Sequence, residues 1–257
     1  MEEGVKSVER AFQILERVSL AKNGIGVTEL AAELNMYKST IHRVLTTLVN
    51  LGYIEQDPQT ERYKLGFKLL EVSSRLLDSL DIRREAMPFL QELADWTNEV
   101  VHLVVLSKGQ VVYIEKVEGT ETIRMHSRVG HRAPVHCTGV GKAILAYLPE
   151  AQVREIIRQY GLEAHTRHTL STLPDLLADL ELVRQRGYAL DLQENEMGIT
   201  CVAAPIFDHT GAVVASVSVS APTIRMQPER LEELAKEVRT IGLKISGRLG
   251  YRSQSEI

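Results

Sequence analysis

Two cysteines stand near residue types that could take part in nucleophilic chemistry. His136 directly precedes Cys137, and Asp191 lies on the N-terminal side of Cys201. A cysteine becomes a strong nucleophile when a neighbouring base removes its proton. An enzyme that uses Cys137 or Cys201 is therefore one alternative for the function. No further motif supports it, so we expect no catalytic residue.

Metal binding is a second chemistry that these residue types allow. Cysteine and histidine are zinc ligands, and His165 and His168 are three residues apart in a predicted loop. The sequence contains no paired cysteine spacing and no His-Glu-x-x-His sequence. We therefore expect no metal and no cofactor.

A run of small residues from His136 to Ala146 (HCTGVGKAILA) leads into a predicted helix. The first amide N–H groups of a helix lack an intrahelical acceptor and can bind an anion. This run is not a Walker A loop, because the spacing before Gly141-Lys142 differs and no serine or threonine follows the lysine. It could equally be a glycine turn that packs a helix on a sheet.

Ser218 and Ser220 alternate with Val217 and Val219 near the C-terminus. The period of two in a strand places both hydroxyls on one face and both valines on the other. Hydroxyls on a concave sheet face suit a small polar ligand, although small residues could equally fill a crowded core. The segment from Asp191 to Cys201, with Gly198 between two strands, is a further candidate for the same site.

A third kind of chemistry is contact with phosphate. No acidic residue occurs between Leu34 and Ile54, whereas Lys38, His42 and Arg43 fall inside this segment. A surface that displaces counterions from DNA needs this local lack of negative charge. The segment therefore indicates a nucleic-acid contact, even though the net charge of the chain is −4.

Three predicted helices position these basic residues. Apolar residues at helical spacing predict helices over Ser7–Leu20, Thr28–Leu34 and Tyr37–Leu51. Ser7 and Thr28 are candidate N-caps, and Gly52 ends the third helix. The outward residues of the third helix could read a major groove or simply face solvent, and the turn before the helix favours the groove. They are Lys38, Ser39, Thr40, His42, Arg43, Thr46 and Thr47.

A hairpin follows the third helix. Tyr53–Glu55 and Arg62–Leu65 read as strands, and Asp57-Pro58-Gln59-Thr60 has proline at the second turn position. Helix, short helix, turn, helix and hairpin is the order of a winged helix-turn-helix. Arg62 and Lys64 on the wing could reach phosphates, or they could be solvated edge charges.

The rest of the chain predicts a second domain. A helix from Phe67 to about Leu80 leads to a boundary within Leu80–Arg84, and another helix runs towards Trp96. Strands and helices then alternate, and tight turns join neighbouring strands, which predicts an antiparallel sheet flanked by helices. The predicted strands are Val100–Leu106, Val111–Val117, Ile123–Ser127, Tyr188–Leu192, Cys201–Phe207 and Val213–Ser220. The predicted helices are Gly141–Leu148, Ala151–Tyr160, Leu173–Arg186 and Pro228–Leu249.

Length and composition agree with a two-domain α/β protein. The chain has 257 residues, of which 44% are hydrophobic and 25% charged, as in ordinary globular proteins. Its longest apolar runs are too short to span a membrane, and the acidic N-terminus does not look like a signal peptide. We therefore expect a cytoplasmic protein without a membrane partner.

The sequence resembles the isocitrate lyase regulator (IclR) family of transcription factors. The N-terminal match comprises Ser7-Val8-x-Arg10-Ala11-x-x-Ile14-Leu15, Leu30-Ala31, Lys38-Ser39-Thr40-x-His42-Arg43-x-Leu45-x-x-Leu48, Gly52-Tyr53-Ile54 and Tyr63-Lys64-Leu65-Gly66. The C-terminal match comprises Gly139-x-Gly141-Lys142-Ala143, Arg186-Gly187-Tyr188, Glu194, Gly198, Cys201-Val202-Ala203-Ala204-Pro205-Ile206-Phe207-Asp208 and Ser218-Val219-Ser220. Order and spacing agree over nearly the full length.

The resemblance implies a winged helix-turn-helix over residues 1–66, a linker helix over 67–81 and a GAF-like effector-binding domain over 82–257. It further implies homodimers or tetramers that bind double-stranded DNA at a palindromic operator. The effector would be a small organic acid or a related metabolite. Carried over by position, the effector pocket comprises Gly139, Val140, Asp191, Cys201, Ser218 and Ser220.

We therefore expect a ligand-responsive regulator of a catabolic operon, and a repressor rather than an activator. Val140 stands where some glyoxylate- or pyruvate-binding relatives have a smaller residue, so the ligand of those relatives is not carried over. The rival from another class is the enzyme with a cysteine nucleophile and an accessory helical domain. A second rival is an architectural DNA-binding protein that has no effector.

Overall fold

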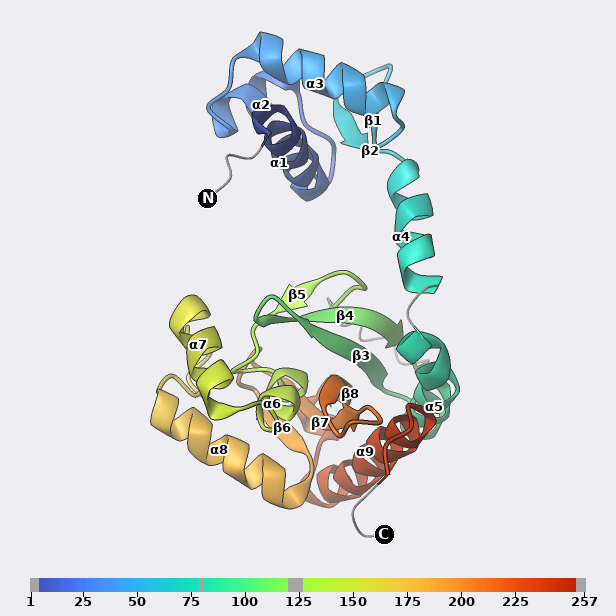
Figure 1. Ribbon diagram of the computed structural model, residues 1–257, viewed down its shortest axis with the longest axis vertical. Coiled ribbons are helices and arrows are strands. Elements are labelled where there is room, and N and C mark those ends of the chain that lie inside the picture. The colour runs from blue at the N-terminus through green and yellow to red at the C-terminus, as the bar shows by residue number, and fades with distance from the viewer. Residues whose placement is uncertain (1–4, 79–80, 120–126, 253–257) are drawn as a thin grey trace. The chain divides into compact units, whose positions relative to one another are not determined.

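The computed structural model describes residues 5–78, 81–119 and 127–252. The chain divides into two compact units, Met1–Ser79 and Leu80–Ile257, which are described separately below (Figure 1). The finer division into residues 1–66, 67–81 and 82–257 stays a prediction.

The first unit begins with three helices packed around one core. They are α1 (Lys6–Leu20), α2 (Val27–Glu33) and α3 (Lys38–Asn50). Ile14 of α1, Leu30 of α2 and Leu45 of α3 have no exposed surface and belong to the same apolar cluster. The predicted apolar stripe of α3 is confirmed, because Ile41, Leu45 and Leu48 are buried.

The predicted caps of the first two helices are wrong. α1 begins at Lys6 after Val5, so Ser7 lies inside the helix, and no side chain caps its N-terminus. α2 begins at Val27, one residue before Thr28. The backbone N–H of Gly26 donates to the Glu29 carboxylate at 3.2 Å. A carboxylate in the first turn thus replaces the predicted threonine cap.

The predicted hairpin is present as β1 (Ile54–Gln56) and β2 (Tyr63–Leu65), which pair antiparallel. Gly52 lies just beyond α3 with a φ of 78°, a conformation that glycine adopts at low cost. At the hairpin turn, Oδ1 of Asp57 accepts the backbone N–H groups of Gln59 and Thr60, each at 2.9 Å. Helix α4 (Lys68–Asp78) follows the hairpin.

A six-stranded antiparallel sheet forms the centre of the second unit, in the order β5-β4-β3-β8-β7-β6 (Figure 1). The strands are β3 (Val100–Ser107), β4 (Gln110–Val117), β5 (Arg132–Ala133), β6 (Ala189–Leu192), β7 (Ile199–Phe207) and β8 (Val213–Pro222). β3 and β4 are joined by the tight turn that the sequence predicts, with Lys108 and Gly109 at φ of 50° and 75°.

Helices cover both faces of this sheet, as predicted. α5 (Asp81–Thr97) and α9 (Pro228–Arg248) pack on one face. α6 (Gly139–Leu145), α7 (Glu150–Tyr160) and α8 (Leu173–Arg186) lie on the other (Figure 1). A 3-10 turn, Thr223–Arg225, connects β8 to α9. Two apolar cores result, one on each face.

Three details of the second unit differ from the sequence-based expectation or lie beyond it. α6 begins at Gly139 rather than Gly141, because the Thr138 hydroxyl caps it by accepting the Gly141 N–H at 3.2 Å. The strand predicted at Ile123–Ser127 lies outside the described residues, apart from Ser127, which is in no strand. β5, two residues long, is too short to show a periodicity.

Within the described ranges, no helix is long and apolar enough to cross a membrane.

Candidate functional site

Polar side chains form a row across three neighbouring strands of the second unit. Cys201 of β7 is opposite Asp191 of β6 and also opposite Ser220 of β8. Directly opposed residues point to the same face of a sheet. The next row on that face pairs Ser218 of β8 with His102 of β3. The alternation of serine and valine thus arises because β8 separates a polar cavity from the core beneath α5 and α9.

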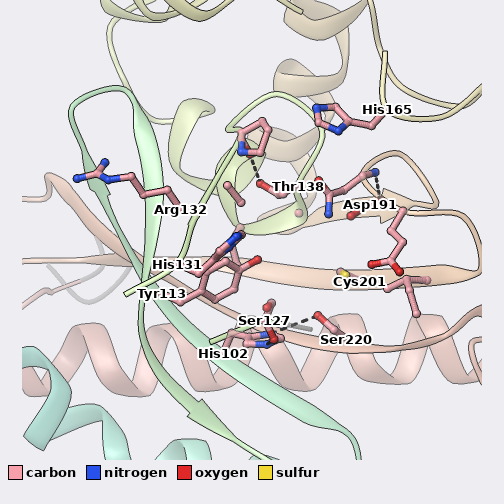
Figure 2. A pocket seen from close by; sticks show the side chains of 18 residues that line it. His102, Tyr113, Ser127, His131, Arg132, Thr138, His165, Asp191, Cys201 and Ser220 are labelled. Atoms are coloured by element: carbon pink, nitrogen blue, oxygen red, sulfur yellow. Dashed lines mark hydrogen bonds between the residues drawn. The ribbon is translucent and has the colours of Figure 1, made fainter. Parts of the chain in front are cut away.

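A cavity of about 290 Å³ lies over these rows, and the N-terminus of α6 contributes Gly139 and Val140 to its wall (Figure 2). The structure brings together all the residues predicted for the effector pocket. They are Gly139, Val140, Asp191, Cys201, Ser218 and Ser220. Their common location makes one site possible, and their role in effector binding stays a prediction.

Much of the cavity wall consists of residues that were not predicted from the sequence. These residues come from β3, β4 and β5, from the loops before and after β5, from the loop between α7 and α8 and from the loop after β6. They include His102, Tyr113, Ser127, His131, Arg132, Thr138, His165, Asn195 and Glu196. A single histidine within the apolar strand Val100–Leu106 could have signalled His102. Loop residues such as His131 carry no periodic signal.

Asp191 is the most perturbed carboxyl group of the cavity. Its Oδ1 accepts the backbone N–H of Glu194 at 2.7 Å, yet the residue is almost fully buried. Burial raises the pKa of Asp191 to about 7, and the nearby Glu194 carboxylate adds to this effect. The group is therefore close to half-protonated at neutral pH, so it can accept or donate a hydrogen bond.

His102 supplies a neutral imidazole to the opposite side of the cavity. Burial lowers the pKa of His102 to about 3, and the charge of Lys116 adds to the effect. Its Nε2 lies 2.7 Å from the Ser127 hydroxyl, and its Nδ1 lies 3.4 Å from that of Ser220 (Figure 2). Its ring packs edge-on against Tyr113 at 5.0 Å. The His102 side of the cavity can therefore contact a ligand through hydrogen bonds but not through a positive charge on the imidazole.

The electrostatics disfavour a cysteine nucleophile. Burial raises the pKa of Cys137 to about 12, and the carboxylates of Asp191 and Glu194 raise it further. Burial and Asp191 likewise hold the pKa of Cys201 far above its usual range. Reactive cysteines need the opposite, a lowered pKa next to positive charge.

Lys142 of the glycine-rich run points into the protein rather than towards the cavity. It is only 1% exposed, and its Nζ lies 2.6 Å from a Glu194 oxygen and 2.9 Å from one of Asp179. It therefore fixes α6 to α8 and to the turn after β6. Lys142 neutralises protein carboxylates and is not aimed at a ligand anion.

The two glycines of α6 have different roles. A Cβ on Gly141 would lie 2.3 Å from the carbonyl oxygen of Val135, so this position needs glycine for packing. A Cβ on Gly139 would meet nothing closer than the Ala203 Cβ at 3.4 Å. Of the two readings of this run, packing explains Gly141, while Gly139 faces the cavity.

In the first unit, the outward face of α3 is free of contacts with the core. Lys38, Ser39, His42, Arg43, Thr46 and Thr47 are exposed, and Thr40 is half-buried. The hydroxyls of Thr46 and Thr47 donate to the backbone carbonyls of His42 and Arg43, at 2.9 and 3.0 Å. These threonines could therefore contact a base through their methyl group or by accepting a hydrogen bond. Their role in DNA binding stays a prediction.

The two basic residues of the wing differ. The Arg62 guanidinium donates to both carboxylate oxygens of Glu29 at 2.8 and 3.3 Å, and its Nε donates to the carbonyl of Gly24 at 3.1 Å. This arrangement favours a structural role over the predicted phosphate contact. Lys64 is exposed, and its Nζ lies 3.7 Å from Glu55, so it stays available to a phosphate.

Comparison with known families gives matches along both units. Residues 7–58 match the IclR helix-turn-helix domain. Residues 74–247 match the C-terminal domain of the bacterial transcriptional regulator IclR.

Individual relatives agree with the family match. The chain is 39% identical to the HTH-type transcriptional regulator KdgR of Dickeya chrysanthemi over 249 residues, which is 97% of this chain and 81% of the relative. It is 31% identical to the HTH-type transcriptional repressor AllR of Escherichia coli K12, over 98% of this chain and 93% of the relative. An IclR homologue of Microbacterium hydrocarbonoxydans, solved with 4-hydroxybenzoate, has a TM-score of 0.82 at 25% identity, covering 95% of this chain and 98% of the other.

These matches decide between the protein classes that the sequence left open. Both curated relatives are named as regulators of transcription rather than as enzymes. The matched domains combine a DNA-binding helix-turn-helix with the C-terminal domain in which the polar cavity lies. The chain belongs to the IclR family of bacterial transcriptional regulators, non-enzymatic proteins that bind DNA and respond to an effector.

Proposed function

We propose that this protein represses a catabolic operon and is controlled by a small hydroxylated organic acid. Its α3 helix reads the operator, and the acid binds between α6 and the sheet of the second unit. The observation that carries this proposal is the row of Asp191, Cys201 and Ser220 beneath the N-terminus of α6. It places polar groups from several segments around one cavity of about 290 Å³.

The cavity suits an acid that also carries hydroxyl or keto groups. Ser218 and Ser220 offer hydroxyls to a carboxylate, and first-turn amides of a helix favour anions. Asp191, with its pKa raised to about 7, can pair with a ligand hydroxyl in either protonation state. The homologue solved with 4-hydroxybenzoate, a hydroxylated acid, supports this ligand class.

We further propose that the protein acts as a homodimer or tetramer on a palindromic operator in the cytoplasm. Large apolar side chains of the first unit support self-association, because Phe12 is 60%, Phe67 78% and Leu70 64% exposed. A dimer presents two recognition helices to two half-sites. Repression is supported by the name of the relative AllR, and cytoplasmic location follows from the need to reach chromosomal DNA.

The effector would act by binding one quaternary arrangement more tightly than another. Such a preference shifts the population of dimers or tetramers whose recognition helices fit the operator. Couplings of this kind are typically about 1–3 kcal/mol, or roughly 5–150-fold in affinity.

The DNA-binding part of this proposal is tested by Arg43→Ala. Arg43 is exposed on α3, so the variant should fold normally but bind a promoter fragment less tightly by about 1–3 kcal/mol. Fluorescence anisotropy with the protein's own promoter fragment, at several salt concentrations, measures the loss. Lys22→Ala is the matched control, because it removes the same charge from an exposed turn of the same unit. Equal affinities of the two variants would refute the role of α3.

A further inference from the structure

A cluster of metal-ligating side chains lies at the edge of the cavity. His136, Cys137 and His165 each place one ligand atom within 4.8 Å of the others. His136 and Cys137 precede α6 and are buried, whereas His165 comes from the loop between α7 and α8 and is exposed. Two sequence-distant segments thus bring two imidazoles and a thiol together, although their spacing in the sequence does not suggest a metal site.

The hydrogen bonding of His136 fixes its tautomer in the form that a metal ligand needs. Nε2 lies 3.0 Å from the backbone carbonyl of Glu163. A carbonyl only accepts, so Nε2 carries the proton, and in the neutral ring Nδ1 keeps a free lone pair. Metal-bound histidines commonly donate their second N–H to a carbonyl in this way.

The loop that carries His165 is anchored before any metal arrives. The backbone N–H of His165 donates to the Thr169 hydroxyl at 3.1 Å, and that hydroxyl donates to the carbonyl of Glu194 at 2.6 Å. The Thr166 hydroxyl also donates to the Gln193 carbonyl at 2.7 Å. These bonds tie the loop to the turn that follows Asp191, so the cluster is largely preorganised.

A cavity-lining residue also contacts the cysteine of this cluster. The thiol of Cys137 lies 3.6 Å from Oδ1 of Asn195, and both Asn195 and His165 line the cavity. If the thiol loses its proton, rotation of the Asn195 amide would turn its NH₂ group towards the sulfur. The cluster therefore adjoins the cavity through His165 and Asn195, and the Asn195 amide could donate a hydrogen bond to the Cys137 thiolate.

We propose that His136, Cys137 and His165 bind a Zn²⁺-like transition-metal ion. Two nitrogens and one sulfur suit tetrahedral Zn²⁺ and leave one coordination position for water or for an oxygen of a ligand in the cavity. Binding displaces the proton of the Cys137 thiol to solvent and forms the metal–sulfur bond, without any change of oxidation state. The exposed His165 gives the ion a route of entry. The sequence predicted no metal, and metal binding here does not depend on the proposed effector.

Cobalt(II) is the probe, because a bond between cysteine sulfur and Co²⁺ gives a charge-transfer absorption band. The band disappears when Zn²⁺ displaces Co²⁺ from the site. The full-length protein, stripped of metal with a chelator, should bind one Co²⁺ per chain with this band and release one proton. Cys137→Ser should abolish the band. His165→Ala, at an exposed position, should weaken Co²⁺ binding at least about 10–100-fold.

Two matched variants test whether Co²⁺ binds at this cluster or at other cysteine and histidine side chains of the cavity wall. Cys201→Ser removes the other cysteine and His131→Ala another exposed histidine of the cavity wall, and both should retain the band and the affinity. Thermal unfolding checks that each variant is folded. The proposal is overturned if the wild type shows no saturable band. It is also overturned if the band survives Cys137→Ser, or if His165→Ala and His131→Ala bind Co²⁺ equally well.

Discussion

At the scale of single residues, Asp191 combines two opposing influences. Backbone N–H groups of Glu194 and Asn195 donate to its Oδ1, which favours the carboxylate. Burial outweighs them and raises its pKa to about 7, from an ordinary value of 3.8. The unfolded chain therefore loses this proton at lower pH than the folded chain does. Between these two pH values the contribution of Asp191 to folding stability falls as the pH rises.

The variant Asp191→Asn should remove this pH-dependent penalty while its amide oxygen still accepts the two backbone N–H groups. Its stability advantage over the wild type should grow by about 1.4 kcal/mol per pH unit between about pH 4 and 7, then level off. Melting temperatures of both proteins at pH 5 and pH 8 measure the effect. A difference in Tm that is the same at both pH values would contradict the raised pKa of Asp191.

The two glycines of α6 give a second residue-scale prediction. Gly141→Ala should destabilise the second unit by about 1–3 kcal/mol, because its Cβ would overlap the Val135 backbone. Gly139→Ala should leave Tm near that of the wild type and weaken effector binding, since its methyl group would enter the cavity. Thermal unfolding of both variants compares them. Equal losses of Tm would show that packing alone explains this glycine-rich run.

At the scale of elements, the wing depends on Arg62. Arg62→Ala should lower the melting temperature of the first unit slightly, by the equivalent of about 1 kcal/mol or less, because the pair with Glu29 is partly exposed. The slope of log affinity for DNA against log salt should stay that of the wild type. Lys64→Ala is the control for charge, because it removes an exposed basic side chain from β2, two residues after Arg62. A slope reduced by about one in Arg62→Ala, with unchanged stability, would instead favour a phosphate contact.

The helices and strands could be predicted where a pattern within a single segment of the sequence identifies them. Apolar periodicity defined α3, the alternation of Val217 to Ser220 defined β8, and a glycine beyond the last turn marked the end of α8 at Gly187. The cavity was only half predictable, because sequence patterns do not say which strands are neighbours. His102 faces Ser218 only because β3 pairs with β8, and this pairing joins segments more than a hundred residues apart.

At the scale of the whole molecule, we propose that the cavity controls DNA binding. A ligand that prefers one quaternary arrangement must change the affinity for operator, and by linkage the operator must change the affinity for ligand equally. An architectural DNA-binding protein would show neither effect. The cavity-lining Ser220, almost fully buried beneath α6, is where this claim is most directly tested.

The deciding measurement is the affinity of the full-length protein for its own promoter fragment, with and without an acid. Thermal-shift screening of pyruvate, glyoxylate, gluconate and 4-hydroxybenzoate first selects the acid, as a saturable rise in Tm. We predict that this acid weakens DNA binding at least about fivefold in the wild type. It should have no effect on Ser220→Leu, whose larger apolar side chain occupies part of the cavity in place of the hydroxyl and leaves α3 unchanged. Control of DNA binding by the cavity is contradicted if no such acid alters DNA binding, or if the acid acts equally on Ser220→Leu.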